Sequence, residues 1–288
     1  MDFSDPMNVW WAVMMGINAV SLVVYLLLMV RSVRTDQFEP ENRTYKQRMR
    51  ILGLIFVCVS LYRSMFVSSY PNRLAWVDSM ANSPLIIRLM ATCAEISYSL
   101  LVALPVLHMG KELAVNCRSR LDYFLLHKLP WGTVICLCTA QCFAYGGLIT
   151  QHLTCFAIEE TLWTLGFLCV APAALTYCYH VFRYHRYDPA YRMLRAALLV
   201  LSVFTVGYLC YQCFFSLPFT YYSKLPADWA KPHLGFSEGI RDALWNFTVT
   251  RDFDTWGGIG FFIWHTGYFS ICTWMNMLFG MAPRKLEQ

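Results

Sequence analysis

The stretch PLIIRLMATCAEISYSLLVALPVLH, Pro84 to His108, decides the fold, because it is long and apolar and yet carries two charged residues. A helix turns about 100° per residue, so Arg88 and Glu95 fall within about 20° of each other on its surface. Ionisable groups at membrane depth cost about 2.5 to 3.5 kcal/mol each and normally face a bundle interior or a cavity. The stretch therefore predicts an inner transmembrane helix that lines a site.

The composition is that of an integral membrane protein. The chain has 288 residues, of which 57% are hydrophobic and only 14% are charged, whereas soluble domains carry about 25% charged residues. The first apolar run, Val9 to Val30, is longer than the core of a signal peptide and is expected to stay as a span. We expect an all-α, multi-pass protein surrounded by a lipid bilayer.

Seven apolar windows, each about 19 residues or longer, predict seven membrane spans in a single bundle over residues 1–288. The predicted spans are 9–30, 51–69, 84–108, 131–150, 156–182, 196–216 and 257–280. Residues 217–256 are expected to form an outer loop with an amphipathic helix from Ser237, in which Ile240 and Leu244 recur at helical spacing. This helix either packs over the outer end of the bundle or acts as a lid, and simple packing is the commoner arrangement.

The basic residues between the predicted spans orient the chain. Sixteen Lys and Arg lie in the loops and tail on one side of the seven spans, and five lie on the other side. The positive-inside rule makes the side with sixteen cytoplasmic. The amino terminus is therefore expected outside and the carboxyl terminus inside, as an odd number of spans requires. Topology and anionic lipid explain these basic loops, so no nucleic-acid partner is expected.

Polar side chains from several spans are expected to share one layer in the outer half of the bundle, given a rise of 1.5 Å per residue. The candidate ligand-binding residues are Arg63, Arg88, Glu95, Glu159, Glu160, His265 and Asn276. In the last span, His265, Cys272 and Asn276 should lie along one helical face. We expect an outward-facing cavity, closed below Leu100, that binds a small anionic or zwitterionic ligand or relays ions or protons, as in a receptor or transporter.

Two other function classes stay open. The charged layer is also typical of a structural or assembly subunit, whose buried salt bridges fix helix order and whose partners are other membrane proteins. A membrane-embedded enzyme that modifies lipid is less favoured, because the adjacent Glu159 and Glu160 diverge by about 100° on a helix and no nucleophile, zinc or nucleotide motif occurs. No catalytic residue, metal site or cofactor is therefore predicted.

Seven spans with an outer amino terminus resemble the layout of rhodopsin-like receptors and microbial rhodopsins. The resemblance is confined to topology. The last span has no lysine for a retinal Schiff base and no Asn-Pro-x-x-Tyr motif, and Arg63 within the second span is foreign to the receptor pattern. No family is assigned on these residues, and layout alone does not indicate function.

Overall fold

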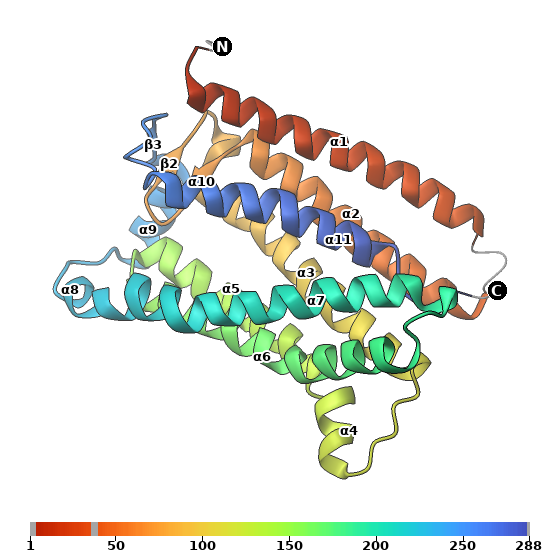
Figure 1. Ribbon diagram of the computed structural model, residues 1–288. Coiled ribbons are helices and arrows are strands. Elements are labelled where there is room, and N and C mark those ends of the chain that lie inside the picture. The colour runs from red at the N-terminus through yellow and green to blue at the C-terminus, as the bar shows by residue number, and fades with distance from the viewer. Residues whose placement is uncertain (1–3, 36–39, 287–288) are drawn as a thin grey trace.

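Long helices make up most of the chain and run side by side in one bundle (Figure 1). The structure is a computed structural model that describes residues 4–35 and 40–286. Its long helices are α1 (Pro6–Thr35), α2 (Arg43–Met65), α3 (Pro84–Glu112), α5 (Pro130–Thr150), α6 (Leu153–Tyr184) and α7 (Arg192–Tyr211). The π-helical segment η5 (Gln212–Tyr221) continues α7, and the last helical run consists of α10 (Ile259–Thr266), the π-helical segment η7 (Gly267–Cys272) and α11 (Thr273–Gly280).

Short elements connect these helices. They are η2 (Pro40–Asn42), η3 (Met80–Asn82), α4 (Arg120–His127), η4 (Pro189–Tyr191), η6 (Tyr222–Lys224), α8 (Leu225–Trp229), α9 (Phe236–Trp245) and the strands β1 (Ser68–Ser69), β2 (Leu74–Ala75) and β3 (Thr248–Val249). The strands form one small sheet in the order β1-β2-β3, with β1 antiparallel and β3 parallel to β2. This sheet and α9 lie at the same end of the bundle (Figure 1).

Five helical runs in the described ranges are long and apolar enough to cross a membrane. They are Pro6–Arg34, Pro84–Glu112, Pro130–Thr150, Leu153–Tyr184 and Pro189–Trp229. Large apolar side chains such as Leu27 and Val203 are about two-thirds exposed on the outside of the bundle, where a soluble protein would carry polar residues. The chain is therefore a multi-pass membrane protein. The basic helix α2 and the run 259–280 are not among the five.

The helices that contain two of the predicted spans end at other residues than those spans do. The second predicted span extends to residue 69, but α2 ends at Met65, because Phe66 leaves the helical conformation and Ser68–Ser69 pair with Leu74–Ala75. The sixth predicted span ends at residue 216, but the helix continues through Tyr221. Pro218 normally ends an α-helix, whereas here it lies inside the wider π-helical turns of η5.

Helix α3 lies inside the bundle, as the charges in its sequence suggest. It contacts α2, α5, α6 and α11. Its first turn is capped by Ser83, whose hydroxyl accepts the N–H of Ile86, and Pro84 occupies the first helical position, where no N–H is needed. In its second half Leu101, Val102 and Val106 are buried in the largest apolar cluster of the molecule.

Helix α9 is held against the bundle by the turn between β1 and β2. Arg73 bonds the carboxylate of Asp242 on α9 at 2.8 Å and the carbonyl of Leu148 on α5 at 2.7 Å. The amphipathic helix inferred from the sequence is confirmed, although it begins at Phe236, one residue earlier than Ser237. It packs on α3 and α5.

Candidate functional site

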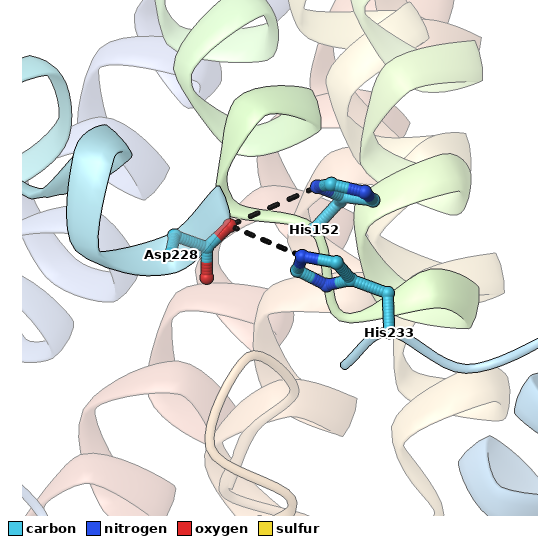
Figure 2. Close-up of side chains that lie close together, drawn as sticks. All are labelled: His152, Asp228 and His233. Atoms are coloured by element: carbon cyan, nitrogen blue, oxygen red, sulfur yellow. Dashed lines mark ion pairs between the residues drawn. The ribbon is translucent and has the colours of Figure 1, made fainter. Parts of the chain in front are cut away.

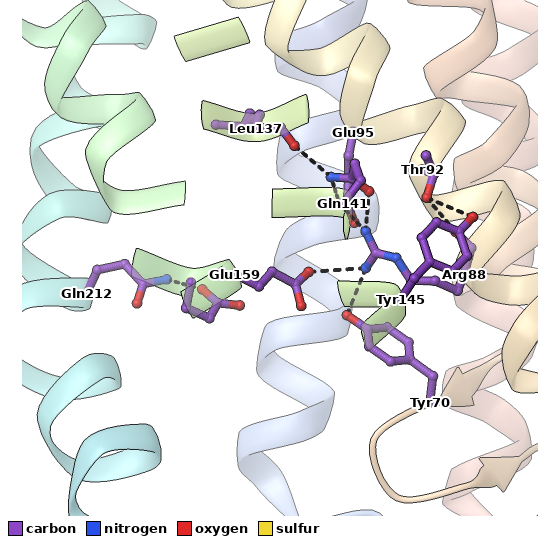
Figure 3. A network of polar contacts seen from close by, with 10 residues as sticks. Tyr70, Arg88, Thr92, Glu95, Leu137, Gln141, Tyr145, Glu159 and Gln212 are labelled. Carbon is purple, nitrogen blue, oxygen red and sulfur yellow. Dashed lines mark hydrogen bonds and ion pairs between the residues drawn. The ribbon is translucent and has the colours of Figure 1, made fainter. Parts of the chain in front are cut away.

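The guanidinium of Arg88 is the centre of a buried polar network (Figure 3). This side chain is fully buried, and its Nη1 donates to the hydroxyl of Tyr70 at 3.1 Å and to Glu159 at 3.2 Å. Its Nη2 donates to Glu95 at 2.5 Å and to the amide oxygen of Gln141. Four acceptors from four segments therefore neutralise one cation, which is the arrangement that makes a buried charge tolerable.

Gln141 on α5 completes the network. Its amide nitrogen donates to Glu95 at 2.8 Å and to the carbonyl of Leu137 at 3.0 Å, while its amide oxygen accepts from Arg88. Both ends of the amide are used, so the network fixes its orientation. Arg88 and Glu95, seven residues apart on α3, meet on the face that the helical period predicts.

A cavity of about 560 Å³ lies beside this network, a volume within the usual range for small-molecule sites. Its walls come from α2, the β1–β2 turn, α3, α6, the end of α7 with η5, and α10 with η7. The lining residues are Arg63, Tyr70, Glu95, Tyr98, Glu159, Glu160, Trp163, Phe167, Phe204, Tyr208, Tyr211, Gln212, Ser216, Thr220, Tyr221, Phe261, Trp264, Gly267, Tyr268, Phe269, Ile271 and Cys272. Most of the wall is aromatic, with one arginine and three glutamates among the rings.

The guanidinium of Arg63 is a charged group of the cavity wall with incomplete hydrogen bonding. Arg63 is buried on α2, and its Nε and Nη2 have no hydrogen-bond partner among the described residues. The guanidinium lies over the ring of Phe269, with its carbon atom 5.2 Å from the ring centroid. A cation–π contact recovers only part of the desolvation cost of a cation. Two donors of Arg63 are therefore left without an acceptor among the described residues.

Glu160 provides a second charged group on the wall. Its carboxylate accepts the amide N–H of Gln212 at 2.7 Å, and the same amide also donates to the hydroxyl of Tyr208 at 2.9 Å. Gln212 is the first residue of η5, so this contact ties α6 to the π-helical part of the wall. Unlike Glu95 and Glu159, Glu160 has no ion pair among the described residues.

The cavity has a rim on the side of the bundle. Tyr211, Trp264 and Ile271 line it and are 54%, 47% and 59% exposed, respectively. Tyr211 ends α7, whereas the other two belong to α10 and η7, so the rim lies between these two helices. On a membrane-embedded bundle, such exposed apolar residues face lipid.

The residues named from the sequence occupy three kinds of position. Arg63, Glu95, Glu159 and Glu160 line the cavity, and Arg88 lies directly behind Glu95 and Glu159. The remaining two, His265 and Asn276, are fully buried and do not line the cavity themselves.

His265 is enclosed by aromatic rings. The centroids of Trp10 and Phe269 lie 5.2 and 4.5 Å from that of the imidazole. Asn276 donates to the carbonyl of Cys272 within its own helix at 2.6 Å. Cys272 lines the cavity while His265 does not, so the single face that α-helical spacing predicts for this span is interrupted. The π-helical segment η7 lies between the two residues and changes the register.

No protein-family model, curated protein or solved structure matches the chain. Its function is therefore argued from the site itself.

Several members of the site carried no clear signal in the sequence. Gln141 and Gln212 are polar residues within apolar runs, and that pattern could have identified them. Tyr70 lies between two strands outside the long helices, and the aromatic wall residues are indistinguishable in sequence from ordinary lipid-facing or core residues. Only the tertiary fold brings them to one cavity.

Proposed function

We propose that the protein binds a zwitterionic amphipathic ligand in this cavity and serves in a receptor-like or transporter-like role. The observation that carries the proposal is the guanidinium of Arg63 on the wall of a largely aromatic cavity, whose Nε and Nη2 have no hydrogen-bond partner among the described residues. Buried donors without acceptors are costly, so an anionic ligand group beside Arg63 removes that cost. A phosphate or carboxylate is the complementary chemistry.

The other end of the ligand is inferred from Glu160 and its neighbours. This carboxylate lies among Trp163, Tyr208 and Tyr221 on the cavity wall. Aromatic faces combined with an acidic group are the usual receptors for quaternary or primary ammonium groups. Arg63 and Glu160 together favour a ligand that carries both a negative and a positive group. A ligand with only a negative charge would be repelled by the three carboxylates on the same walls.

The rim indicates how such a ligand enters. Tyr211, Trp264 and Ile271 join the cavity to the apolar side of the bundle. An amphipathic molecule can place its headgroup in the polar part of the cavity and leave its hydrocarbon tail among these residues. This route supports a ligand of the phospholipid or lysophospholipid class over a small, fully water-soluble one.

Binding of a fluorescent lysophosphatidylcholine to the purified protein in nanodiscs tests the proposal. Replacement of Arg63 by glutamine should weaken binding about 10-fold or more, equivalent to about 1.4 kcal/mol, because one charge-assisted contact is lost. Glu160→Gln should weaken binding of this probe but leave binding of a fluorescent fatty acid, which has no cationic group, largely unchanged.

The matched control for these variants is Arg120→Gln, on the exposed first turn of α4. It removes the same charge away from the cavity and should bind the probe like the wild type. Melting temperatures of all variants establish that they are folded. Equal affinity of wild type and Arg63→Gln for the probe would remove the proposal.

A structural or assembly role is the second candidate, and the four hydrogen bonds of the Arg88 Nη1 and Nη2 atoms favour it. All four partners of this guanidinium are side chains of the protein itself. Such a network sets the relative positions of α3, α5 and α6 without any ligand. The two roles are compatible, because Arg88 can fix the helices while Arg63 contacts the ligand.

We further propose that α2 and the run 259–280 also cross the membrane, which gives seven spans with the amino terminus outside. Both run alongside the five apolar helical runs (Figure 1). Three of the basic residues of α2, Lys46, Arg50 and Arg63, are buried in the bundle. This arrangement lowers the cost of placing a basic helix in lipid.

Glycosylation tests the orientation. Two acceptor triplets, Asn42-Arg43-Thr44 at the start of α2 and Asn246-Phe247-Thr248 directly after α9, belong to segments that the proposed orientation puts on opposite sides of the membrane. In a eukaryotic secretory pathway we expect a glycosidase-sensitive mobility shift that Asn246→Gln abolishes and Asn42→Gln leaves intact. A shift that depends on Asn42 would reverse the orientation.

A further inference from the structure

Two histidines and an aspartate converge at the end of the bundle that carries α8 (Figure 2). His152 follows the tight turn that ends α5, Asp228 belongs to α8, and His233 lies in the segment between α8 and α9. The carboxylate oxygen Oδ2 of Asp228 is 3.8 Å from Nδ1 of His152 and 3.9 Å from Nε2 of His233. These separations are too long for hydrogen bonds.

The two imidazole nitrogens that face the carboxylate lack partners. Nδ1 of His152 and Nε2 of His233 are both buried and have no hydrogen-bond partner in the described part of the chain. The two rings stack with centroids 3.3 Å apart, so a positive charge on both would be strongly repulsive. Neutral imidazoles with free lone pairs are the form in which histidine binds a metal ion.

We propose that His152, Asp228 and His233 bind a divalent transition metal ion, with Zn²⁺ as the best match. The three ligand atoms lie within 4.8 Å of one another. Ligands about 2.0 to 2.1 Å from a tetrahedral Zn²⁺ are about 3.3 Å apart. The two measured separations from the carboxylate exceed this spacing by about 0.5 Å, and the separation between the two nitrogens, which is at most 4.8 Å, exceeds it by about 1.5 Å at most. Rotation of the two rings toward a common point would therefore close the site. Two histidines and one carboxylate leave one position for water or another ligand.

The surrounding contacts hold the three side chains near this geometry. Oδ2 of Asp228 also accepts the backbone N–H of Leu153, the first residue of α6, at 2.9 Å, and the indole of Trp229 donates to Thr154 at 2.8 Å. The N–H of Leu234 bonds the carbonyl of Thr150 at 3.2 Å. The segments of all three ligands are thus already tied together. A bound metal would fasten α8 and the following segment to the α5–α6 turn, and it would do so independently of the cavity.

Metal binding to the purified full-length protein tests the inference. Chelator-treated protein is titrated with Zn²⁺ alone and, separately, with Co²⁺, whose visible absorption reports the coordination geometry. We expect one tight site per chain in the wild type, a tetrahedral Co²⁺ spectrum, and a melting temperature that rises with Zn²⁺. His152→Ala and His233→Ala should each weaken binding by about 100-fold or more, since removal of a direct ligand costs at least as much as that of a second-shell partner.

The matched control is His180→Ala, which removes a histidine from α6 outside the triad. It should keep the site, its Co²⁺ spectrum and the Zn²⁺-dependent rise in melting temperature. Asp228→Asn also tests the carboxylate, but it alters the contact with Leu153, so the histidine variants decide. Absence of a stoichiometric metal in the wild type, or equal binding by His233→Ala and His180→Ala, would overturn the inference.

Discussion

Replacement of Arg88 by methionine should lower the free energy of unfolding by about 3 to 5 kcal/mol, because it leaves the carboxylates of Glu95 and Glu159 buried without their cation. Methionine fills much of the same volume, so the loss reflects charge more than packing. The measurement is the thermal or denaturant midpoint of the purified protein in a fixed detergent, with Arg120→Met on exposed α4 as the control. That control should change the midpoint little.

A compensating variant separates the charge effect from any other consequence of the mutation. Arg88→Met combined with Glu95→Gln and Glu159→Gln removes all three charges and leaves neutral amides that still form hydrogen bonds. This triple variant should recover much of the lost stability, since replacing a complete buried ion network is often nearly neutral. If the triple variant were no more stable than Arg88→Met alone, unpaired charge would not be the cause.

Replacement of Gly239 by alanine should detach α9 from the bundle and cost about 1 to 3 kcal/mol in stability. A Cβ atom at this position would overlap the backbone carbonyl oxygen of Ile149, at the end of α5, and a backbone atom has little freedom to move aside. The prediction opposes helix propensity, because alanine is ordinarily favoured over glycine inside a helix by about 0.5 to 1 kcal/mol.

The control for this variant is Gly235→Ala, at the N-cap of the same helix, where a Cβ would meet nothing within 4 Å. Limited proteolysis across residues 225–258 and the melting temperature provide the two readouts. We expect faster cleavage and a lower midpoint for Gly239→Ala only. Identical cleavage of the two variants would contradict the close packing of α9 on α5.

The sequence was most informative where one helix carries the signal by itself. The charges at Arg88 and Glu95 predicted both an inner helix and their common face, because the period of 3.6 residues acts within one element. The apolar runs located the helices for the same reason. The end of α2 was missed because the apolar character of the sequence continues past Met65, and only pairing with β2 draws Ser68–Ser69 into a strand.

The remaining parts of the site depend on contacts between distant segments. Gln141 reaches Arg88 from a position 53 residues away, and Gln212 reaches Glu160 from 52 residues away. His152 and Asp228 of the proposed metal site are 76 residues apart, and no motif spacing in the sequence suggests that they meet. No periodicity within a single helix predicts these contacts. The helical face expected for His265 also differs, because a π-helical turn changes the register and the sequence carries no signal for that turn.

Segment η7 should allow the last helical run to lose one residue while α11 keeps its packing contacts. Deletion of one residue from α11 would rotate everything beyond it by about 100° and turn its packing face away from α2. A π-helical turn holds a surplus residue relative to the α-helical ladder. Loss of one residue within Gly267–Cys272 would let the ladder continue as an α-helix, with both flanks still in register. A single-residue deletion would then reshape the cavity wall and leave the contacts of α11 in place.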